Sequence, residues 1–501
     1  MVREYLETIK ENVDVRQNLI VLKGEIKETT KKHALLYALG NQWDLFYNLL
    51  KDKDPKIRKN IAQILGRLGE KESLPKLFEA YEKEEILFVK GAYLSAIREF
   101  DYREYLPAFK ERLDFLSKQE NEAEEEKHIR EEIKELKEMI LVMEGIKKHT
   151  FTGYNEMSKI ILLTNRNFQK ITLDQMKSHR AKIFNAGVMA KTDNLEEILP
   201  IRTYSELLFV LEDKTSLVVK EGKISEIAES LAKQIAESSL LEFLEKRHKE
   251  DGPYYFRIEC KNAMDLKQKS MLTRGMGYAL EKLSMGKLQN STSNYEIELR
   301  LIENKEGNYN FLIKLFTLKD QRFSYRRKAL STSVQPVNAA LLLELARPYL
   351  TEGAQVLDPF CGVGTLLVER GKLMDAGDMY GIDIFGKGIE AARENTSLTD
   401  IRVNYINRDF FDFTHDYPFD ELITNMPRVM GQKEKKDIIQ IYQKFWKKAK
   451  EHVKVNGILV ILSYDKDILK QTLRNEWYTI LKEYEISKKE GAYGFIIELN
   501  S

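Results

Sequence analysis

The stretch Val356-Leu357-Asp358-Pro359-Phe360-Cys361-Gly362-Val363-Gly364-Thr365 decides the fold of the last third of this 501-residue chain. It reads as an apolar strand, a turn with two glycines and the start of a helix over residues 366–376. Glycine lets the backbone approach a ligand where a Cβ atom would clash. Asp383 ends the next predicted strand, nineteen residues beyond Gly364, where a carboxylate meets ribose hydroxyls in nucleotide-binding α/β sheets. The stretch therefore predicts a site for a nucleotide-type cofactor.

The residues around this turn favour S-adenosylmethionine (SAM) over a dinucleotide. Leu367 stands where the third glycine of the dinucleotide fingerprint would fall. Asp358 would repel a pyrophosphate but suits the cationic amine of a methionyl group. Asp409 closes the third predicted strand and is expected to accept a hydrogen bond from the adenine amine, with Phe410 beside the ring.

After Leu341, predicted strands alternate with predicted helices, as in a parallel sheet with helices on both faces. The expected strands are 355–358, 379–383, 403–406, 421–425 and 458–463, followed by an antiparallel hairpin over 484–487 and 494–499. Residues 326–501 are therefore predicted to form an α/β, Rossmann-like domain.

The fourth predicted strand of this domain ends in Thr424-Asn425-Met426-Pro427-Arg428. Methyltransferases that act on amino groups carry Asn or Asp at this place, with two prolines and an aromatic residue. The Asn side chain and the next carbonyl accept hydrogen bonds from the amine and aim its lone pair at the methyl group, so catalysis is largely positioning. Met426 replaces the first proline and Arg428 replaces the aromatic, although a guanidinium plane also stacks on bases. We expect Asn425, Pro427 and Arg428 to form the catalytic loop, with Arg428 at the mouth of the SAM pocket.

The first 117 residues have helical apolar spacing and an internal repeat. The pattern that starts at Ile57 returns thirty-two residues later at Val89, and the pair Leu74-Pro75 recurs as Leu106-Pro107. Helix pairs that repeat at roughly 30–45 residues stack into an α-solenoid, and this spacing resembles HEAT repeats. An ordinary helical bundle is the alternative. Residues 118–149 read as one charged helix with a solvated face, which links the solenoid to the rest of the chain.

Residues 150–325 are expected to be α+β, arranged as two small units in tandem. Strands are predicted over 159–164, 206–211, 254–259, 295–301 and 311–316, and helices over 224–244 and 266–283.

Residues 150–501 resemble the THUMP-containing, SAM-dependent RNA guanosine-N2 methyltransferases, a family that acts on tRNA or 23S rRNA. The resemblance lies in the loop over 358–365, in Phe323-Ser324-Tyr325-Arg326-Arg327 followed by Ser333-Val334-Gln335-Pro336-Val337-Asn338, and in Arg202-Thr203-Tyr204-Ser205-Glu206-Leu207-Leu208. It implies a ferredoxin-like plus THUMP-like RNA-binding region over 150–325. It also implies a SAM site built from Asp358, Phe360, Gly362, Gly364, Thr365, Asp383, Asp409 and Phe410. The helical first part of the chain lies outside the usual architecture of that family.

Two modest basic stretches with interleaved aromatic residues are candidates for RNA contacts. One lies between residues 251 and 290 and includes Arg257 and Lys261; the other lies between 319 and 328 and includes Arg322, Arg326 and Arg327. In a chain that is 32% charged, charge alone favours an ordinary solvated surface. The family resemblance tips the balance to RNA.

The composition excludes several classes of protein. Lys plus Arg number 80 and Asp plus Glu number 79, for a net charge of +1, so the chain is not polybasic. Two cysteines are too few for a disulfide framework or a four-cysteine zinc site. No metal site is expected, because His128, His179 and His248 read as surface residues. With no apolar run near eighteen residues and no signal peptide, a soluble protein of the reducing cytoplasm is expected.

The leading hypothesis is a SAM-dependent RNA methyltransferase that modifies a guanine amine of tRNA or rRNA, with the solenoid and the central region gripping the RNA. Met426 and Arg428 leave open a SAM-binding RNA or ribosome-assembly adaptor with decayed catalysis. A methyltransferase for protein or small-molecule substrates is a third possibility. A protein partner is also expected on the solenoid, because HEAT-like repeats usually bind partners.

Overall fold

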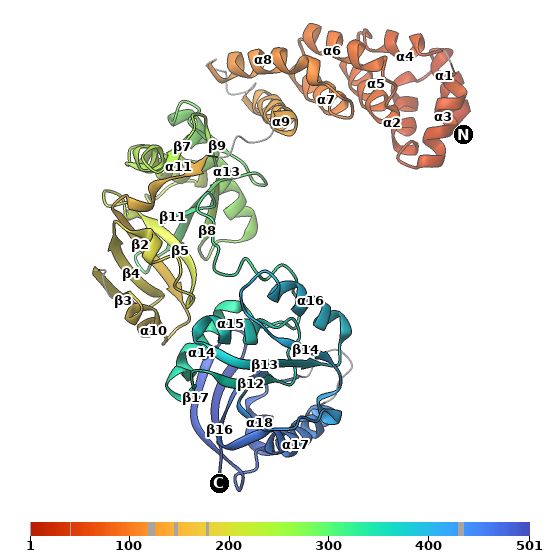
Figure 1. Ribbon diagram of the computed structural model, residues 1–501. Coiled ribbons are helices and arrows are strands. Elements are labelled where there is room, and N and C mark those ends of the chain that lie inside the picture. Colours follow the sequence, from red (N-terminus) through yellow and green to blue (C-terminus); the bar gives the residue numbers. More distant parts are fainter. Residues whose placement is uncertain (1, 41, 119–125, 145–148, 177–179, 429–434) are drawn as a thin grey trace. The chain divides into compact units, whose positions relative to one another are not determined.

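The computed structural model describes residues 2–40, 42–118, 126–144, 149–176, 180–428 and 435–501 (Figure 1). The chain folds into two units, residues 1–147 and residues 148–501. No helix in the described ranges is long and apolar enough to cross a membrane.

The first unit is entirely helical in its described part. Its helices are α1 (Val2–Lys10), α2 (Val15–Glu25), α3 (Thr29–Leu39), α4 (Asp44–Leu49), α5 (Pro55–Leu68), α6 (Ser73–Lys83), α7 (Leu87–Ile97), α8 (Leu106–Lys118) and α9 (Glu126–Glu144). The sequence sets the bounds of α5 closely. Asp54 caps its start by accepting a 2.8 Å hydrogen bond from the amide of Lys56, and Gly69 ends it with a φ of 76°. The predicted repeat is thus seen as helix pairs, α5–α6 and α7–α8.

Helices α2, α5, α7 and α9 pack side by side as one layer of this unit. Gly66 lets α5 approach α7 closely, because a Cβ atom there would lie 2.7 Å from the Cα of Ala96. Residues 118–149 were expected to form a helix with one solvated face that links the solenoid to the rest of the chain, and the linking role was wrong for α9. Its apolar stripe, including Leu136 and Met139, is buried in the helical core. The buried carboxylate of Glu132 is bound by Arg112, at 2.9 Å, so α9 is a structural helix of the first unit.

The second unit begins with a nine-stranded sheet in the order β3-β4-β2-β5-β11-β10-β8-β9, with β6 beside β11. Its elements are β2 (Ser158–Thr164), α10 (Gln169–Asp174), β3 (Arg180–Phe184), β4 (Gly187–Thr192), β5 (Tyr204–Val210), β6 (Ser216–Leu217), α11 (Ile224–Ala236), α12 (Leu240–Glu245), β8 (Tyr254–Lys261), α13 (Leu266–Leu283), β9 (Leu288–Asn290), β10 (Ile297–Glu303) and β11 (Tyr309–Leu315). A separate two-stranded ladder pairs β1 (Thr150–Phe151) with β7 (His248–Lys249). The predicted strands are confirmed, but the two tandem units share one sheet. They join where Phe209 of β5 pairs with Ile313 of β11.

The C-terminal domain is built on a seven-stranded sheet in the order β14-β13-β12-β15-β16-β18-β17. The strands are β12 (Ala354–Asp358), β13 (Ala376–Asp383), β14 (Asn404–Asn407), β15 (Phe419–Asn425), β16 (Val453–Ser463), β17 (Tyr478–Ser487) and β18 (Ala492–Leu499). β18 runs antiparallel to β16 and pairs with β17, which confirms the predicted hairpin. The helix after the glycine turn, α15 (Thr365–Leu373), is shorter than expected, because Ala376 already begins β13.

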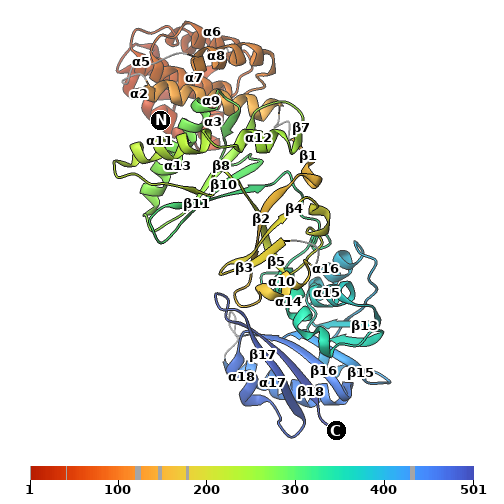
Figure 2. The same ribbon diagram turned by 90° about the vertical axis from the view of Figure 1, so that its left-hand side faces the viewer.

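Helices cover both faces of this sheet (Figure 2). α14 (Pro336–Ala346), α15 and α16 (Gly386–Thr396) pack on one face, and α17 (Lys435–His452) and α18 (Lys466–Thr472) pack on the other. The alternation of side chains along a strand divides the two cores, since Val356 belongs to the first and Leu357 to the second. Near-continuous apolar strands are the expected sequence pattern of a sheet buried on both faces.

Buried polar contacts join the C-terminal domain to the preceding sheet. Glu369 on α15 is 2% exposed and accepts hydrogen bonds of 2.7 and 2.6 Å from Arg202 and of 2.6 Å from the Tyr325 hydroxyl. Asn165 donates from its side-chain amide to Asn338 Oδ1 at 2.9 Å and to the Ile486 carbonyl at 2.7 Å. The segments that carry the family resemblance around Arg202 and Tyr325 therefore lie in this junction.

Candidate active site

The parallel strands β12, β13, β14 and β15 end at one edge of the C-terminal sheet, where α/β proteins bind ligands. The turn after β12 depends on its two glycines. Gly362 and Gly364 have φ values of 52° and 79°, which disfavour other residues. A Cβ atom on Gly364 would lie 2.2 Å from the Tyr405 hydroxyl, whereas one on Gly362 would face open space. The turn is therefore packed tightly against Tyr405 at Gly364 and is open at Gly362.

Asp358 ends β12 with a carboxyl group that is almost wholly buried, the residue being 1% exposed. It accepts a 2.7 Å hydrogen bond from the Thr424 hydroxyl and a 3.1 Å hydrogen bond from the Phe360 amide. Burial, helped by the nearby charge of Asp383, raises the pKa of Asp358 to about 7. No cationic side chain of the described residues pairs with Asp358, and a buried carboxylate of this kind favours a cationic ligand.

Asp383 ends β13 and holds the glycine turn. Its two carboxylate oxygens accept 2.8 Å hydrogen bonds from the amides of Gly362 and Phe385. The next two side chains, Ile384 and Phe385, are 72% and 47% exposed. Exposed apolar side chains directly after a strand-end aspartate are suited to the flat face of an aromatic ligand. The sequence analysis passed over them, although two large apolar residues after Asp383 were a visible signal.

The two residues predicted to contact adenine, Asp409 and Phe410, lie in different surroundings. Asp409 is half-buried, and its carboxylate accepts a 2.9 Å hydrogen bond from the Phe411 amide, which is the geometry of a loop cap. Phe410 is 1% exposed and packs in the core against Phe445, so the expectation that it lies beside the adenine ring was wrong. Phe360 and Phe411, which contact Phe410, remain partly exposed.

The end of β15 carries an unpaired acceptor. Asn425 Oδ1 is buried and has no hydrogen-bond partner among the described residues, and the same holds for Thr365 Oγ1 at the start of α15. Buried polar atoms without partners are rare in folded proteins and indicate a missing ligand or solvent group. The Met426 amide extends the β15–β16 ladder by donating to the Leu462 carbonyl at 2.9 Å, and its side chain is buried in the core. Methionine thus fills an apolar space at the place where proline was expected.

Arg428 stacks on an aromatic ring from the neighbouring strand. The guanidinium carbon of Arg428 lies 4.3 Å from the ring centroid of Tyr464, the residue that follows β16. Burial and the nearby Glu490 raise the pKa of the Tyr464 hydroxyl. Sequence analysis missed Tyr464, because no motif marks the end of the fifth strand. Pro427, which directly precedes Arg428 in the chain, is half-buried.

The donor set of this edge fits SAM. Its ammonium group, ribose hydroxyls and adenine amine all donate hydrogen bonds, and the acceptors here are the carboxylates of Asp358 and Asp383 and the unpaired oxygen of Thr365. The open space at Gly362 lets a ligand lie directly against the backbone of the turn.

Residues 324–489 match the family described as "RMKL-like, methyltransferase domain", and residues 43–117 match the HEAT repeats. The chain is 28% identical to the tRNA (guanine(10)-N2)-dimethyltransferase of Methanothermobacter thermautotrophicus over 163 residues, 31% of this chain and 45% of that protein. It is 28% identical to the ribosomal protein L11 methyltransferase of Aquifex aeolicus over 170 residues, 34% of this chain and 62% of that protein. Each match therefore spans less than two thirds of the relative.

Two solved structures resemble the fold. TrmN from Thermus thermophilus has a TM-score of 0.52 at 18% identity and covers 68% of this chain and 99% of its own. SMU.472, complexed with SAH, has a TM-score of 0.52 at 14% identity and covers 69% of this chain and 98% of its own. The C-terminal domain is a methyltransferase domain of the SAM-dependent fold. SAM is its cofactor.

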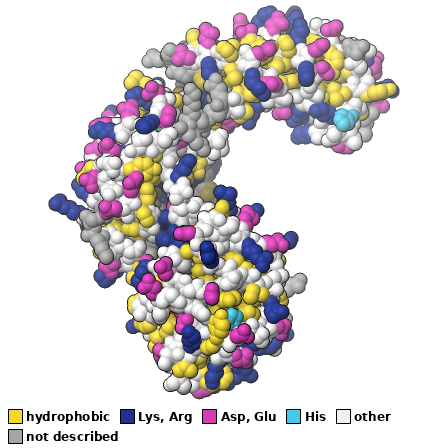
Figure 3. All heavy atoms as spheres, viewed as in Figure 1, with side chains coloured by type: hydrophobic (Ala, Val, Ile, Leu, Met, Phe, Trp, Pro, Cys, Tyr) yellow, Lys and Arg dark blue, Asp and Glu magenta, His cyan; other side chains and the backbone are white. Residues whose placement is uncertain are grey.

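The residues predicted to contact RNA differ in how exposed they are. Lys261 and Arg327 are exposed, and Arg326 is half-buried with a 3.0 Å hydrogen bond to the Val334 carbonyl. Arg257 forms an ion pair with Glu298 and keeps 35% of its side chain exposed. Arg322 is buried and donates to Asp320 and to the carbonyls of Ile201 and Tyr204, so its predicted RNA contact was wrong. On the face drawn in Figure 3, acidic and basic side chains are interspersed.

The histidine predictions also need one correction. His248 is buried, with its ring nitrogens 2.8 Å from the Leu244 carbonyl and 2.7 Å from the Thr317 hydroxyl, so it is not a surface residue. His128 lies near the surface beside Glu131, and His179 lies outside the described residues. Across the described part of the chain, no three His, Cys, Asp or Glu side chains gather as a metal site would require.

Proposed function

We propose that the protein is a SAM-dependent RNA methyltransferase whose target is the exocyclic N2 amine of guanine in tRNA or rRNA. The observation that carries the proposal is the buried, unpaired Oδ1 of Asn425 at the end of β15, the strand tied to the cofactor loop through Thr424 and Asp358. An amide oxygen in this place is an acceptor for an amine N–H. The similarity to a tRNA guanine-N2 enzyme from Methanothermobacter supports the same target atom.

The roles of the site residues follow from their chemistry. SAM supplies a methyl group on a sulfonium centre. Asp358 is expected to balance the cationic methionyl end, and Asp383 to accept from ribose hydroxyls while holding the Gly362 turn. Asn425 Oδ1 accepts a hydrogen bond from the target amine and thereby fixes the direction of its lone pair. Arg428, held over Tyr464, offers a flat cationic surface to the base or to a flanking phosphate.

The central sheet supports an RNA-binding role. The order β3-β4-β2-β5, all antiparallel, is that of a ferredoxin-like β-α-β-β-β unit in which the second helix is reduced to a single turn at Leu195–Glu197. The segment from α11 to β11 would then be the THUMP-like unit. The two similar structures cover 68–69% of the chain, which is a longer part than the methyltransferase domain alone. The exposed Lys261 and Arg327 are the best placed of the predicted RNA contacts.

A protein substrate is the second candidate, and one observation favours it. The similarity to the L11 methyltransferase of Aquifex is as high as the similarity to the tRNA enzyme. A lysine or terminal amine is also a nitrogen nucleophile, which Asn425 can orient in the same way.

One comparison of wild-type and deletion strains distinguishes the RNA substrate from the protein substrate. Nucleosides from tRNA and rRNA, and peptides from ribosomal proteins, are analysed by mass spectrometry in wild-type and deletion strains. We expect one N2-methylguanosine to be lost in the deletion strain and to return with the wild-type gene, but not with Asn425→Ala. Loss of a methylated peptide with an unchanged nucleoside profile would establish the protein substrate instead. An unchanged profile of both would favour a catalytically inactive SAM-binding adaptor.

A further inference from the structure

Four basic side chains gather on the α2–α5 part of the helical layer. Lys23 on α2 donates from Nζ to Asn60 Oδ1 at 2.6 Å and to Gln63 Oε1 at 3.0 Å, both on α5. Arg67, one turn further along α5, donates to the Lys23 carbonyl. The partners of Lys23 are thus neutral amides and not carboxylates.

Lys27 and Lys59 complete the group, which we call the basic cluster: Lys23, Lys27, Lys59 and Arg67. Lys27 lies four residues after Lys23, in the turn that follows α2, where its amide donates to the Gly24 carbonyl. Burial lowers the pKa of Lys23, and the positive charges of Arg67, Lys59 and Lys27 lower it further. None of the four forms an ion pair with a described residue. Other arginines of the same unit do, such as Arg58 with Glu84 and Arg112 with Glu132.

The cluster lies on one face of α5. Residues 60, 63 and 67 follow the i, i+3, i+7 spacing of a single helix face, with Lys59 at its edge. Arg58 precedes Asn60 by two residues and so lies about 200° away around the helix. Lys59 Nζ also lies 5.7 Å from the ring centroid of Phe88 on α7, so the face continues toward the next helix of the layer.

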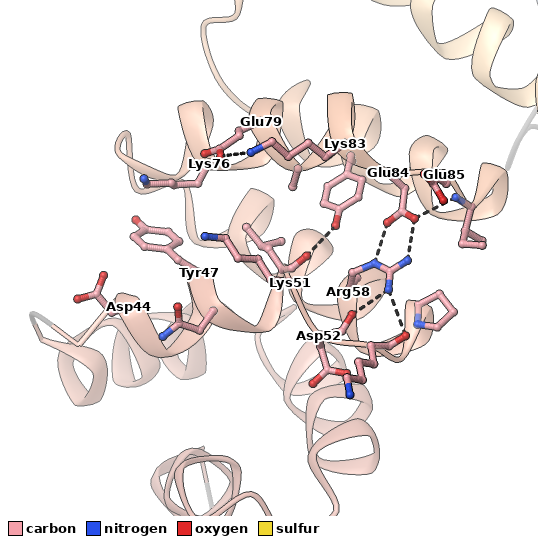
Figure 4. Close-up of a pocket in the computed structure, with 17 residues that line it drawn as sticks. Asp44, Tyr47, Lys51, Asp52, Arg58, Lys76, Glu79, Lys83, Glu84 and Glu85 are labelled. Atoms are coloured by element: carbon pink, nitrogen blue, oxygen red, sulfur yellow. Dashed lines mark hydrogen bonds and ion pairs between the residues drawn. The ribbon is translucent and has the colours of Figure 1, made fainter.

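A cavity of about 690 Å³ in the helical unit provides a contrast with the basic cluster (Figure 4). It lies on the Arg58 side of α5, and five basic and five acidic side chains line it. Its charges are compensated internally, as in the ion pairs Arg58–Glu84 and Lys83–Glu79 drawn in Figure 4. The basic cluster has no such ion pairs with described residues, because Glu25 and Glu28, on either side of Lys27, pair with Lys31. Mutually repelling cations held by packing favour a polyanion, which relieves the repulsion.

We propose that Lys23, Lys27, Lys59 and Arg67 form a phosphate-binding surface that holds the backbone of the RNA substrate. This assignment rests on the proposed RNA methyltransferase function. Evenly spaced phosphates match cations spread over α2, the turn after it and α5, and contacts of this kind position an RNA without reading its sequence. The helical unit then increases affinity for RNA while the C-terminal domain selects the base.

The test compares two triple variants of the full chain. Lys27→Gln/Lys59→Gln/Arg67→Gln removes three charges of the cluster and leaves Lys23, which is tied to Asn60 and Gln63. The control, Lys51→Gln/Lys53→Gln/Lys76→Gln, removes three lysines that line the cavity of Figure 4. Binding of bulk tRNA is measured over a series of salt concentrations, together with SAM affinity and melting temperature.

We expect the cluster variant to bind bulk tRNA about tenfold more weakly at low salt, with a salt slope smaller by about two to three. The control should keep the wild-type slope, and both variants should keep wild-type SAM affinity. The melting temperature of the cluster variant should stay close to that of the wild type, because relief of repulsion offsets the lost hydrogen bond from Arg67 to the Lys23 carbonyl. Equal binding of bulk tRNA by both variants would overturn the proposal, even if the wild-type chain methylates RNA. Loss of binding to polyglutamate without loss of tRNA binding would also overturn it and indicate an acidic protein partner. If the deletion strain loses no nucleoside methylation, the proposed function fails, whereas a cluster-dependent tRNA affinity would still stand.

Discussion

The hydroxyl of Thr424, at the end of β15, donates a 2.7 Å hydrogen bond to the buried carboxyl group of Asp358, at the end of β12. Both residues are almost wholly buried, and their strands are adjacent and parallel. The bond fixes the start of the cofactor turn relative to Asn425, which directly follows Thr424. One short contact thus joins the start of the glycine turn to the strand end that carries Asn425, the residue proposed to orient the target amine.

Asp358 should make both SAM binding and stability depend on pH. Its pKa of about 7 in the folded chain exceeds the ordinary value of 3.8, so the folded state holds this proton more tightly than the unfolded state. The contribution of Asp358 to stability is therefore greatest below about pH 4, falls as pH rises to about 7, and stays unfavourable above that. Asp358→Asn keeps an acceptor for Thr424 and removes the charge. We expect it to raise the melting temperature at about pH 8 without SAM, and to weaken SAM binding there at least tenfold. Scanning fluorimetry and calorimetry test this, and an unchanged SAM affinity would contradict it.

The junction at Glu369 should be sensitive to removal of one partner. Arg202→Ala leaves the buried carboxylate with the Tyr325 hydroxyl alone and should lower the free energy of unfolding by about 3–5 kcal/mol. Arg202→Met/Glu369→Met, which removes both charges, should recover most of this loss. Urea unfolding followed by Trp446 and Trp477, both in the C-terminal domain, measures the difference. A double variant as unstable as Arg202→Ala would show that the charge is not the cause.

Gly66 and Gly91 form a matched pair in the helical layer. Gly66→Ala places a Cβ atom 2.7 Å from the Cα of Ala96 and should destabilise the first unit by about 1–3 kcal/mol. Gly91→Ala, in the middle of α7, meets open space and should stabilise it by about 0.5–1 kcal/mol through helix propensity. Far-UV circular dichroism during thermal unfolding distinguishes the two. SAM affinity should be unchanged in both variants, and a change would mean that this layer affects the cofactor site.

The sequence predicted the features that local chemistry determines. The strand, the glycine turn and the position of Asp383 at the end of the next strand were predicted, since each residue is required by backbone geometry or strand position. Residues whose roles depend on tertiary packing were not predictable. Arg322 lies in a basic stretch of the sequence, but its guanidinium is buried and donates hydrogen bonds to the carbonyls of Ile201 and Tyr204, about 120 residues earlier in the chain. Phe410 follows a strand-end aspartate as expected, yet its ring turns into the core. The charge pattern of α9 indicated one solvated face and a linking role, but its narrow apolar stripe is enough to pack the helix into the core of the first unit.

The pair Arg428–Tyr464 provides the strongest test of the catalytic loop. Arg428 stands where an aromatic residue was expected, and its guanidinium lies over the Tyr464 ring from the adjacent strand end. We expect Arg428→Ala to lower turnover on RNA with SAM affinity unchanged, because it removes a flat surface beside Asn425 and leaves the glycine turn intact. Tyr464→Phe keeps the ring face and should stay near wild type, whereas Tyr464→Ala should resemble Arg428→Ala. Arg428→Tyr, which restores a stacking ring, should retain more activity than alanine.

The double variant Arg428→Ala/Tyr464→Ala decides whether the two side chains act together. If Tyr464 works by holding Arg428, the double variant should be no worse than either alanine variant alone. Single-turnover rates with RNA from the deletion strain give the comparison, and melting temperatures report stability. Alanine variants that lose stability but keep the wild-type rate per folded molecule would make the pair a structural contact. Additive losses of turnover would instead mean that the two residues contact the substrate separately.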